Sequence, residues 1–232
     1  MAEEPTYHCP KCHDSHFVHP LRDGKPDYTD LVGCECVRAA REMEQKQHVM
    51  RWCELPEASE HMTFDNFRRS PELEQTYQAA VAVAVGQEGA NFLTLMSDVD
   101  RGKTHLAVAI CRHWLGRGKL AKYAYVPLLL DELRRGFSEG GSVYQSRFDM
   151  FLNTPLLVLD DLGVENSTPW VQEKLDTIVD YRLMHGLPLV VTTNLMLEQL
   201  SVRIASRLTR SGRLMAIGGP AYSTIREKPH GA

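Results

Sequence analysis

A short segment near the middle of the chain constrains the fold more than any other feature. Residues 91–96 (NFLTLM) form an apolar strand, the loop SDVDRGKT follows at 97–104, and a helix continues with HLAVAICRHWL. Strand, loop, Gly-Lys-Thr and helix in this order are the context of a P-loop, whose amides and helix N-terminus bind phosphate oxygens. In such a loop Lys103 reaches the β- and γ-phosphates of a nucleotide, and the hydroxyl of Thr104 ligates Mg²⁺. The segment therefore predicts a nucleotide site.

The predicted loop departs from the usual pattern. Gly102 precedes the lysine as expected, but Ser97 stands where the pattern has glycine, and Asp100 adds a carboxylate close to the expected phosphates. Glycine serves in such loops because the backbone takes unusual dihedral angles and must approach the ligand closely. The charge of Asp100 would repel a phosphate, and Arg101 beside it offsets part of that charge. Gly-Lys-Thr at a helix start also occurs by chance, so the neighbouring motifs have to decide.

Strands and helices alternate through the rest of the chain. Strands are predicted at residues 91–96, 122–126, 155–161, 188–194 and 213–218, and helices at 76–87, after Lys103, at 127–137 and at 168–185, with two short helices before the last strand. Residues between 137 and 155 are predicted to form a loop. Alternation at this spacing gives βαβ units, and hence a parallel sheet with both faces covered by helices.

Two of the apolar strands end in polar side chains. LLVLDD places Asp160 and Asp161 at the end of one strand, and VVTTN places Asn194 at the end of another. Ligands of open α/β sheets bind outside the carboxyl ends of the strands. There Asp160 suits Mg²⁺ held through water, Asp161 suits the orientation of an attacking water, and Asn194 suits a sensor of the γ-phosphate. Glu165 is a weaker acidic candidate. The alternative is that these side chains only form the turns after the strands.

Four of the six cysteines crowd into the first 36 residues. Cys9 and Cys12 form one close pair, and Cys34 and Cys36 form another. Two such pairs offer four thiolates in a tetrahedron, which suits structural zinc, and Zn²⁺ binding would stabilise a segment that lacks an apolar core. Two disulfides are the alternative. His8, His13 and His16 are reserve ligands, and the alternative is that they are ordinary surface histidines.

Composition limits the class of protein. The chain has 232 residues, of which 43% are hydrophobic and 24% charged, which allows one large domain and a small one. We expect a zinc module with a partner-binding helix at 1–54, a connector at 55–75 anchored by Phe64 and Phe67, and the nucleotide-binding domain at 76–232. The net charge of −4 means that a nucleic-acid contact needs a local basic patch. No apolar run long enough to span a membrane and no secretory signal are evident, so we expect a cytoplasmic protein.

Six segments together resemble the bacterial helicase-loader family, the DnaC-like AAA+ ATPases and their IstB-like transposition-helper relatives. The segments are GKTHLAVAI, YVPLLLDELRRGF, PLLVLDDLGVE, TPWVQEKLDTIVDYR, LPLVVTTNL and RIASRL, and they occur in the family's order and spacing. The resemblance covers about residues 60–226, and a cysteine-rich head is also typical of many members. The fold that it implies is a P-loop NTPase of the AAA+ type with a small N-terminal zinc module.

The resemblance also implies roles for individual residues. Lys103 and Thr104 are the phosphate and Mg²⁺ residues, Asp160 and Asp161 the acidic pair, Asn194 the first sensor, Arg207 the arginine finger acting on a neighbouring subunit, and Arg226 the second sensor. The family has a second glycine where this chain has Asp100. Without the resemblance, Arg203 and Arg207 would be interpreted as a solvated basic helix face.

The family binds ATP and single-stranded DNA, assembles into an arc or ring, and grips a replicative helicase with its N-terminal part. The first hypothesis is therefore an ATP-dependent helicase loader or remodeller. A second is a transposition helper ATPase that coats DNA and engages a transposase. A third is an adaptor of the same fold that does not hydrolyse ATP, because Ser97 and Asp100 replace glycines.

Overall fold

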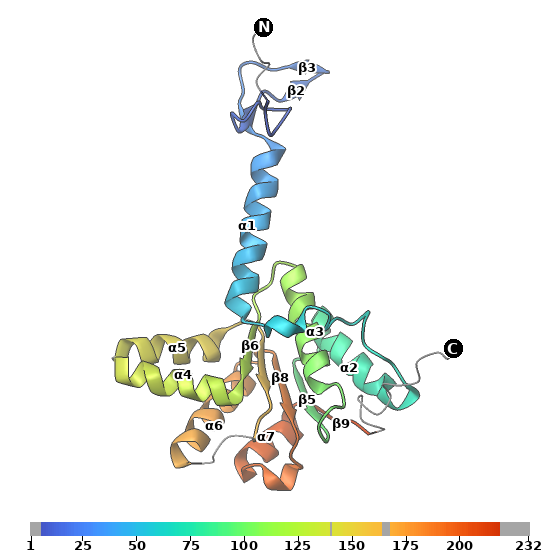
Figure 1. Ribbon diagram of the computed structural model, residues 1–232, viewed down its shortest axis with the longest axis vertical. Coiled ribbons are helices and arrows are strands. Elements are labelled where there is room, and N and C mark those ends of the chain that lie inside the picture. Colours follow the sequence, from blue (N-terminus) through green and yellow to red (C-terminus); the bar gives the residue numbers. More distant parts are fainter. Residues whose placement is uncertain (1–5, 140, 164–167, 219–232) are drawn as a thin grey trace, which may run out of the picture. The chain divides into compact units, whose positions relative to one another are not determined.

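The structure is a computed structural model that describes residues 6–139, 141–163 and 168–218. The chain divides into two compact units, residues 1–48 and 49–232. Helix α1 (Glu35–Cys53) begins in the smaller unit and ends in the larger one (Figure 1). It corresponds to the partner-binding helix that the sequence predicts within residues 1–54.

The larger unit is built on a five-stranded parallel sheet with the order β6-β7-β8-β5-β9. The strands are β5 (Phe92–Met96), β6 (Lys122–Tyr125), β7 (Leu157–Asp160), β8 (Leu189–Thr193) and β9 (Arg213–Ala216). Each of the five predicted strands is confirmed. Because β7 and β8 are neighbours and β5 follows, the carboxyl ends of the three motif-bearing strands meet at one edge of the sheet.

Helices cover both faces of this sheet. They are α2 (Glu74–Val85), α3 (Lys103–Gly116), α4 (Val126–Glu139), α5 (Gly141–Asn153), α6 (Pro169–Met184) and α7 (Val202–Ser211), together with the short 3₁₀ turns η1 (Glu57–Ser59), η2 (Pro71–Leu73) and η3 (Leu197–Gln199). In Figure 1, α2 and α3 lie on one side of the strands and α4 to α6 on the other.

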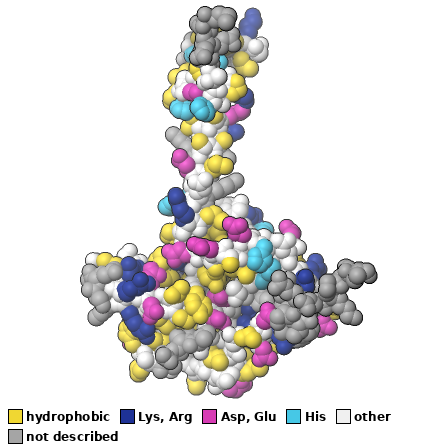
Figure 2. Space-filling view, viewed as in Figure 1, with side chains coloured by type: hydrophobic (Ala, Val, Ile, Leu, Met, Phe, Trp, Pro, Cys, Tyr) yellow, Lys and Arg dark blue, Asp and Glu magenta, His cyan; other side chains and the backbone are white. Residues whose placement is uncertain are grey.

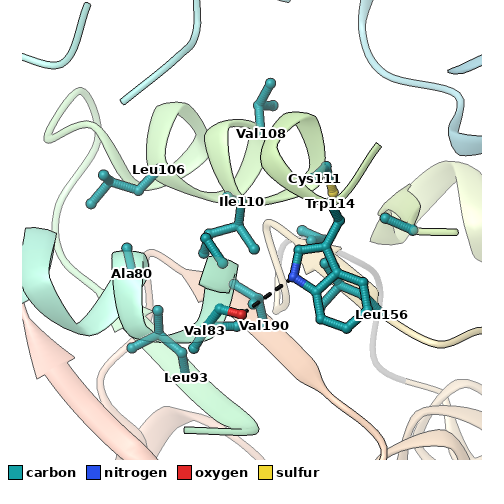
Figure 3. Packing of buried hydrophobic residues seen from close by; sticks show 14 of the residues in the cluster. Ala80, Val83, Leu93, Leu106, Val108, Ile110, Cys111, Trp114, Leu156 and Val190 are labelled. Carbon is teal, nitrogen blue, oxygen red and sulfur yellow. Dashed lines mark hydrogen bonds between the residues drawn. The ribbon is translucent and has the colours of Figure 1, made fainter. Parts of the chain in front are cut away.

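Two apolar clusters fill the space between the sheet and its helices. One lies under α2 and α3, where Trp114 packs among aliphatic side chains and its Nε1 donates a hydrogen bond to the carbonyl of Val83 at 3.3 Å (Figure 3). The other lies under α4 to α7. Burial of apolar surface on both faces holds the sheet rigid, and a rigid sheet is what positions side chains at its edge.

Helix α5 corrects the sequence analysis, which predicted a loop in this segment. Its apolar side chains Tyr144, Phe148, Phe151 and Leu152 follow the i, i+4, i+7, i+8 spacing of one helix face. Phe148, Phe151 and Leu152 are buried in the cluster shared with α4 and α6. Tertiary packing therefore stabilises a helix in a segment that was predicted to be a loop.

The aromatic residues of the connector anchor it within the larger unit, as predicted. Phe67 is buried in the cluster under α2 and α3, and Phe64 packs against the same cluster. Both rings contact Tyr77 of α2, with centroid separations of 5.9 and 5.6 Å. Residues 60–67 are thereby held beside the start of α3.

The smaller unit contains two small antiparallel strand pairs and the first part of α1. Strand β1 (Phe17–Val18) pairs with β4 (Val32–Gly33), and β2 (Leu21–Arg22) pairs with β3 (Lys25–Pro26). Among its side chains that the structure describes, Cys12 and Cys34 are the buried ones. Within the described part of the chain, no helix is long and apolar enough to cross a membrane.

Candidate nucleotide site and cysteine cluster

The loop between β5 and α3 curls around the side chain of Lys103. Gly102 has a φ of 86°, and Asp100, where the related family has glycine, has a φ of 60°. Both are left-handed conformations, which glycine adopts freely and aspartate adopts at some cost. Ser97 has no positive φ, so the glycine expected there is not required by the backbone.

Lys103 is buried, and its ammonium group already has three acceptors. Nζ donates to the carbonyl of Ser97 at 2.9 Å, to the Ser97 hydroxyl at 3.0 Å and to the carbonyl of Asp98 at 2.7 Å. Burial lowers the pKa of Lys103, while Asp161, Asp160 and Asp98 oppose that shift. Since an ammonium group has three hydrogens, a phosphate must compete with one of these acceptors, and the Ser97 hydroxyl is the one that a glycine would not supply.

Asp160 lies at the end of β7 with its carboxylate buried among hydroxyl groups. Thr104 donates to its Oδ1 and Oδ2 at 3.1 Å each, and Thr192 donates to Oδ1 at 2.7 Å. Tyr123 of β6 donates to Oδ2 at 2.6 Å. Thr104 and Asp160, each predicted to serve Mg²⁺, are therefore in contact, whereas the contacts from Thr192 and Tyr123 were not predicted from the sequence.

Asp161 and Asn194 meet on the same edge of the sheet. The amide of Asn194 donates to Oδ1 of Asp161 at 2.8 Å, and the backbone N–H of Asp161 donates to the Thr192 hydroxyl at 2.9 Å. Burial raises the pKa of Asp161, the charge of Asp160 raises it further, and Lys103 opposes both. A carboxyl group with a raised pKa beside an amide is suited to accepting a proton from water.

A pocket of about 450 Å³ brings these residues together with the connector. Its lining includes Lys103, Thr104, Asp161 and Asn194 on the sheet side, and His61, Met62, Asn66 and Phe67 on the connector side. His105 connects the two sides of the pocket, because its Nε2 forms a hydrogen bond of 2.7 Å with the carbonyl oxygen of Thr63 in the connector. The sequence predicts that Phe67 is an anchor, but not that the same segment, MTFDNF, supplies a wall of the site.

Arg207 lies away from this pocket, on α7. Its Nε is 2.6 Å from Oδ1 of Asp180 on α6, and Arg203 pairs with Oδ2 of the same carboxylate at 2.6 Å. The expected common face of the two arginines is thus present, and the Arg207 side chain is 44% exposed. Arg226 and Glu165 lie outside the described residues.

The four N-terminal cysteines form a compact cluster. The Sγ atoms of Cys9 and Cys34 are 3.8 Å apart, those of Cys12 and Cys36 are 3.6 Å apart, and all four lie within 4.8 Å of one another. A tetrahedron with Zn–S bonds of about 2.3 Å places its sulfurs about 3.8 Å apart, whereas a disulfide needs about 2.05 Å. The cluster therefore fits zinc, and the disulfide alternative does not match these separations.

The surroundings of the cluster shift the pKa values of its thiols in opposite directions. The backbone N–H groups of Cys12 and Lys11 lower the pKa of Cys9 to about 7, whereas burial raises the pKa of Cys36 to about 12. The Asp14 carboxylate accepts the N–H of Cys9 at 2.9 Å and fixes the first turn. In the described residues, the group of possible metal ligands contains these four cysteines and none of the reserve histidines.

The chain is similar to a known family and to several known proteins. The family model described as "IstB-like ATP binding protein" matches residues 24–209. The replicative helicase loader DnaC of Escherichia coli (strain K12) is 29% identical over 113 residues, which are 49% of this chain and 46% of DnaC. The chain thus matches about half the length of that relative.

Two further similarities cover more of the chain. A putative ATP-binding protein in an insertion sequence of Mycobacterium tuberculosis (strain ATCC 25618 / H37Rv) is 22% identical over 215 residues, 86% of this chain and 84% of that protein. The crystal structure of the DnaC helicase loader has a TM-score of 0.60 at 24% identity and covers 70% of this chain and 100% of that one. The expected α/β fold is confirmed.

Proposed function

The chain belongs to the family of IstB-like ATP-binding proteins, and from this premise we propose that it is an AAA+ protein that uses ATP to load or remodel a replicative DNA helicase. The observation that carries the proposal is the meeting of Lys103, Thr104 and Asp160 beside a pocket of about 450 Å³. The similarity to the helicase loader DnaC supports a helicase as the partner. We place this activity in the cytoplasm.

The residues at the sheet edge fit ATP with Mg²⁺. Lys103 would bind the β- and γ-phosphates after exchanging its bond to the Ser97 hydroxyl. Thr104 would turn its oxygen toward Mg²⁺ and keep its hydrogen on Asp160, as the 3.1 Å contacts allow. Mg²⁺ when bound neutralises phosphate charge. The base would lie against the connector wall of His61, Met62 and Phe67.

Hydrolysis would use the pair formed by Asp161 and Asn194. Asp161 accepts a proton from the attacking water, and Asn194 holds the carboxylate in place through its 2.8 Å hydrogen bond. Arg207 would act on the ATP of a neighbouring subunit in an arc, ring or filament, after leaving Asp180. The turnover is expected to be weak, because the loop already satisfies Lys103.

A basic and aromatic face formed by α4, α5 and α6 is our candidate for binding single-stranded DNA. The Arg134 guanidinium lies over the Trp170 ring at 5.4 Å, and Lys174 lies 5.9 Å from the Tyr144 ring centroid. Figure 2 shows Lys and Arg side chains beside hydrophobic ones over the region of α4 and α5. Aromatic rings that stack on bases, together with cations that contact phosphates, are the usual means of binding single strands.

The cysteine cluster would hold Zn²⁺ in the N-terminal module, for which we keep the limits 1–54. Because its side chains bury so little apolar surface, the metal would supply most of its stability. The helix α1, with mixed charges, suits a protein contact, and we assign the helicase contact to this module. Metal content of the purified chain, expected at one zinc per chain, is the direct check.

Two other functions remain candidates. The insertion-sequence protein that matches 86% of this chain favours a transposition helper that engages a transposase. The saturated ammonium group of Lys103 favours an adaptor that binds ATP without turnover.

Co-purification tests the proposal. The tagged full-length chain should retain the replicative helicase of its own cell when ATP is present and lose it when Cys12→Ser disrupts the metal cluster. A chain that retains the neighbouring transposase and no helicase would replace the loader with the transposition helper. Retention that is identical with and without nucleotide, together with no hydrolysis, would establish the adaptor.

A further inference from the structure

Tyr123 reaches the nucleotide site from the edge strand of the sheet. It lies in the middle of β6, its side chain is 6% exposed, and its hydroxyl donates to Oδ2 of Asp160 at 2.6 Å. No role follows for it from the phosphate loop or from the polar strand ends. A buried hydroxyl aimed at the carboxylate proposed to face Mg²⁺ therefore needs an explanation.

The hydrogen bonds of Asp160 show what this hydroxyl does. Strand β7 lies between β6 and β8, and the carboxylate accepts one hydroxyl from each side: Tyr123 on Oδ2 and Thr192 on Oδ1. These two donors fix the carboxylate plane from the flanking strands. The remaining donor, Thr104, approaches both oxygens at 3.1 Å from the phosphate loop. Its bonds are longer, so Thr104 is the donor that is free to adjust.

The Tyr123 hydroxyl and the carboxylate that it contacts belong to two buried residues. Tyr123 is 6% exposed and Asp160 3%. The backbone N–H of Tyr123 donates a hydrogen bond to the sulfur of Cys53, the last residue of α1.

We propose that Tyr123 is a positioning residue for Mg²⁺ in the nucleotide site. Its hydroxyl holds Oδ2 of Asp160, so that the Thr104 hydrogen stays on the carboxylate and the Thr104 oxygen faces the phosphate side. The inference rests on the proposed ATP site. It deepens that proposal by adding a residue from the edge strand, and it makes Mg²⁺-dependent binding the property that Tyr123 controls.

The test compares Tyr123→Phe with the matched variant Tyr125→Phe, which removes a phenol hydroxyl two residues along the same strand. ATP affinity is measured by calorimetry on the full-length chain, with Mg²⁺ and then with EDTA. We expect Tyr123→Phe to bind ATP about tenfold more weakly than the wild type in Mg²⁺, the loss of one hydrogen bond to a charged group. Its affinity in EDTA should equal that of the wild type, and Tyr125→Phe should match the wild type in both solutions.

Each other outcome contradicts a definite claim. Equal affinities of Tyr123→Phe and the wild type in Mg²⁺ would overturn the positioning role. Equal losses in Mg²⁺ and EDTA would show that Tyr123 supports only the fold of the pocket, which also overturns it. A wild type that binds ATP in neither solution would instead contradict the ATP site itself, and the inference would fall with it.

Discussion

The two halves of the nucleotide site differ in how they satisfy their polar groups. In the phosphate loop, Lys103 bonds to the loop itself, and Asp100 takes a left-handed conformation that glycine would adopt more easily. At the strand ends, Asp160 and Asp161 are held by side chains from neighbouring strands. The strand ends are thus organised for a ligand, whereas the loop has to give up an internal contact to receive one.

On the proposed function, phosphate binding and hydrolysis depend on different residues of the site. The loop would determine how tightly the phosphates bind, because its acceptors compete with them for Lys103. At the strand ends, Asp160 would add the Mg²⁺-dependent part of binding, whereas Asp161 would act in hydrolysis. Substitutions in the loop and at Asp161 should therefore change different measured quantities.

The largest effect is expected from Asp161→Asn, at the strand ends. Without a carboxylate to accept the proton, hydrolysis should fall by about 100-fold or more. ATP affinity should change less than threefold, since the loop is untouched. Phosphate release in single-turnover experiments measures the first quantity and calorimetry the second. An unchanged rate would remove Asp161 from the proposed chemistry.

The pH dependence of hydrolysis provides the next test of the same half. The pKa of Asp161 is raised by burial and by Asp160, so the protonated form, which cannot accept a proton, persists to higher pH than in an ordinary aspartate. The hydrolysis rate should therefore rise with pH, and the midpoint of this rise should lie above the usual pKa range of an aspartate. A midpoint within the usual aspartate range would show that Asp161 is not the group whose protonation controls the rate.

In the loop, Ser97→Ala should strengthen ATP binding by about fivefold. The change removes the hydroxyl acceptor from Lys103 without altering a backbone that has no positive φ there, and one such bond contributes roughly 1 kcal/mol. Ser97→Gly is the matched variant and should behave alike. Weaker binding in both variants would mean that the hydroxyl itself contacts the nucleotide.

The smallest effect is expected from Asp100→Gly. Glycine relieves a left-handed conformation at φ 60° that costs roughly 1 kcal/mol or less for aspartate, so the melting temperature should rise by a few degrees. Asp100→Asn keeps the side-chain shape and removes the charge. If both variants bind ATP more tightly than the wild type and to the same extent, the charge of Asp100 is what weakens binding. If only Asp100→Gly binds more tightly, the backbone conformation is the cause.

The sequence predicts most of the fold and the part of the site that follows from strand order. Five apolar runs correspond to the five strands, and polar residues directly after a parallel strand have to meet at one edge, which is why Asp160 and Asn194 lie near Lys103. Helix α5 was missed although its apolar side chains follow the spacing of one helix face; what the sequence does not show is that α4 and α6 pack against that face.

Contacts made from the middle of a strand or from the connector could not be predicted. The alternation of a strand shows that Tyr123 faces one side of the sheet, but not that its hydroxyl reaches a carboxylate on the next strand. Likewise, the aromatic residues of the connector predict that it is anchored, but the register that places Phe67 beside Gly102 depends on the packed structure.

On the proposed function, Lys103 binds ATP in competition with the acceptors of its own loop. Calorimetry of ATP with Mg²⁺, on the wild type and on Lys103→Ala, is the measurement that tests this claim. The wild type should bind, and Lys103→Ala should bind at least about 100-fold more weakly, since a charged group that contacts two phosphates is lost. Equal affinities for the two proteins would contradict the claim.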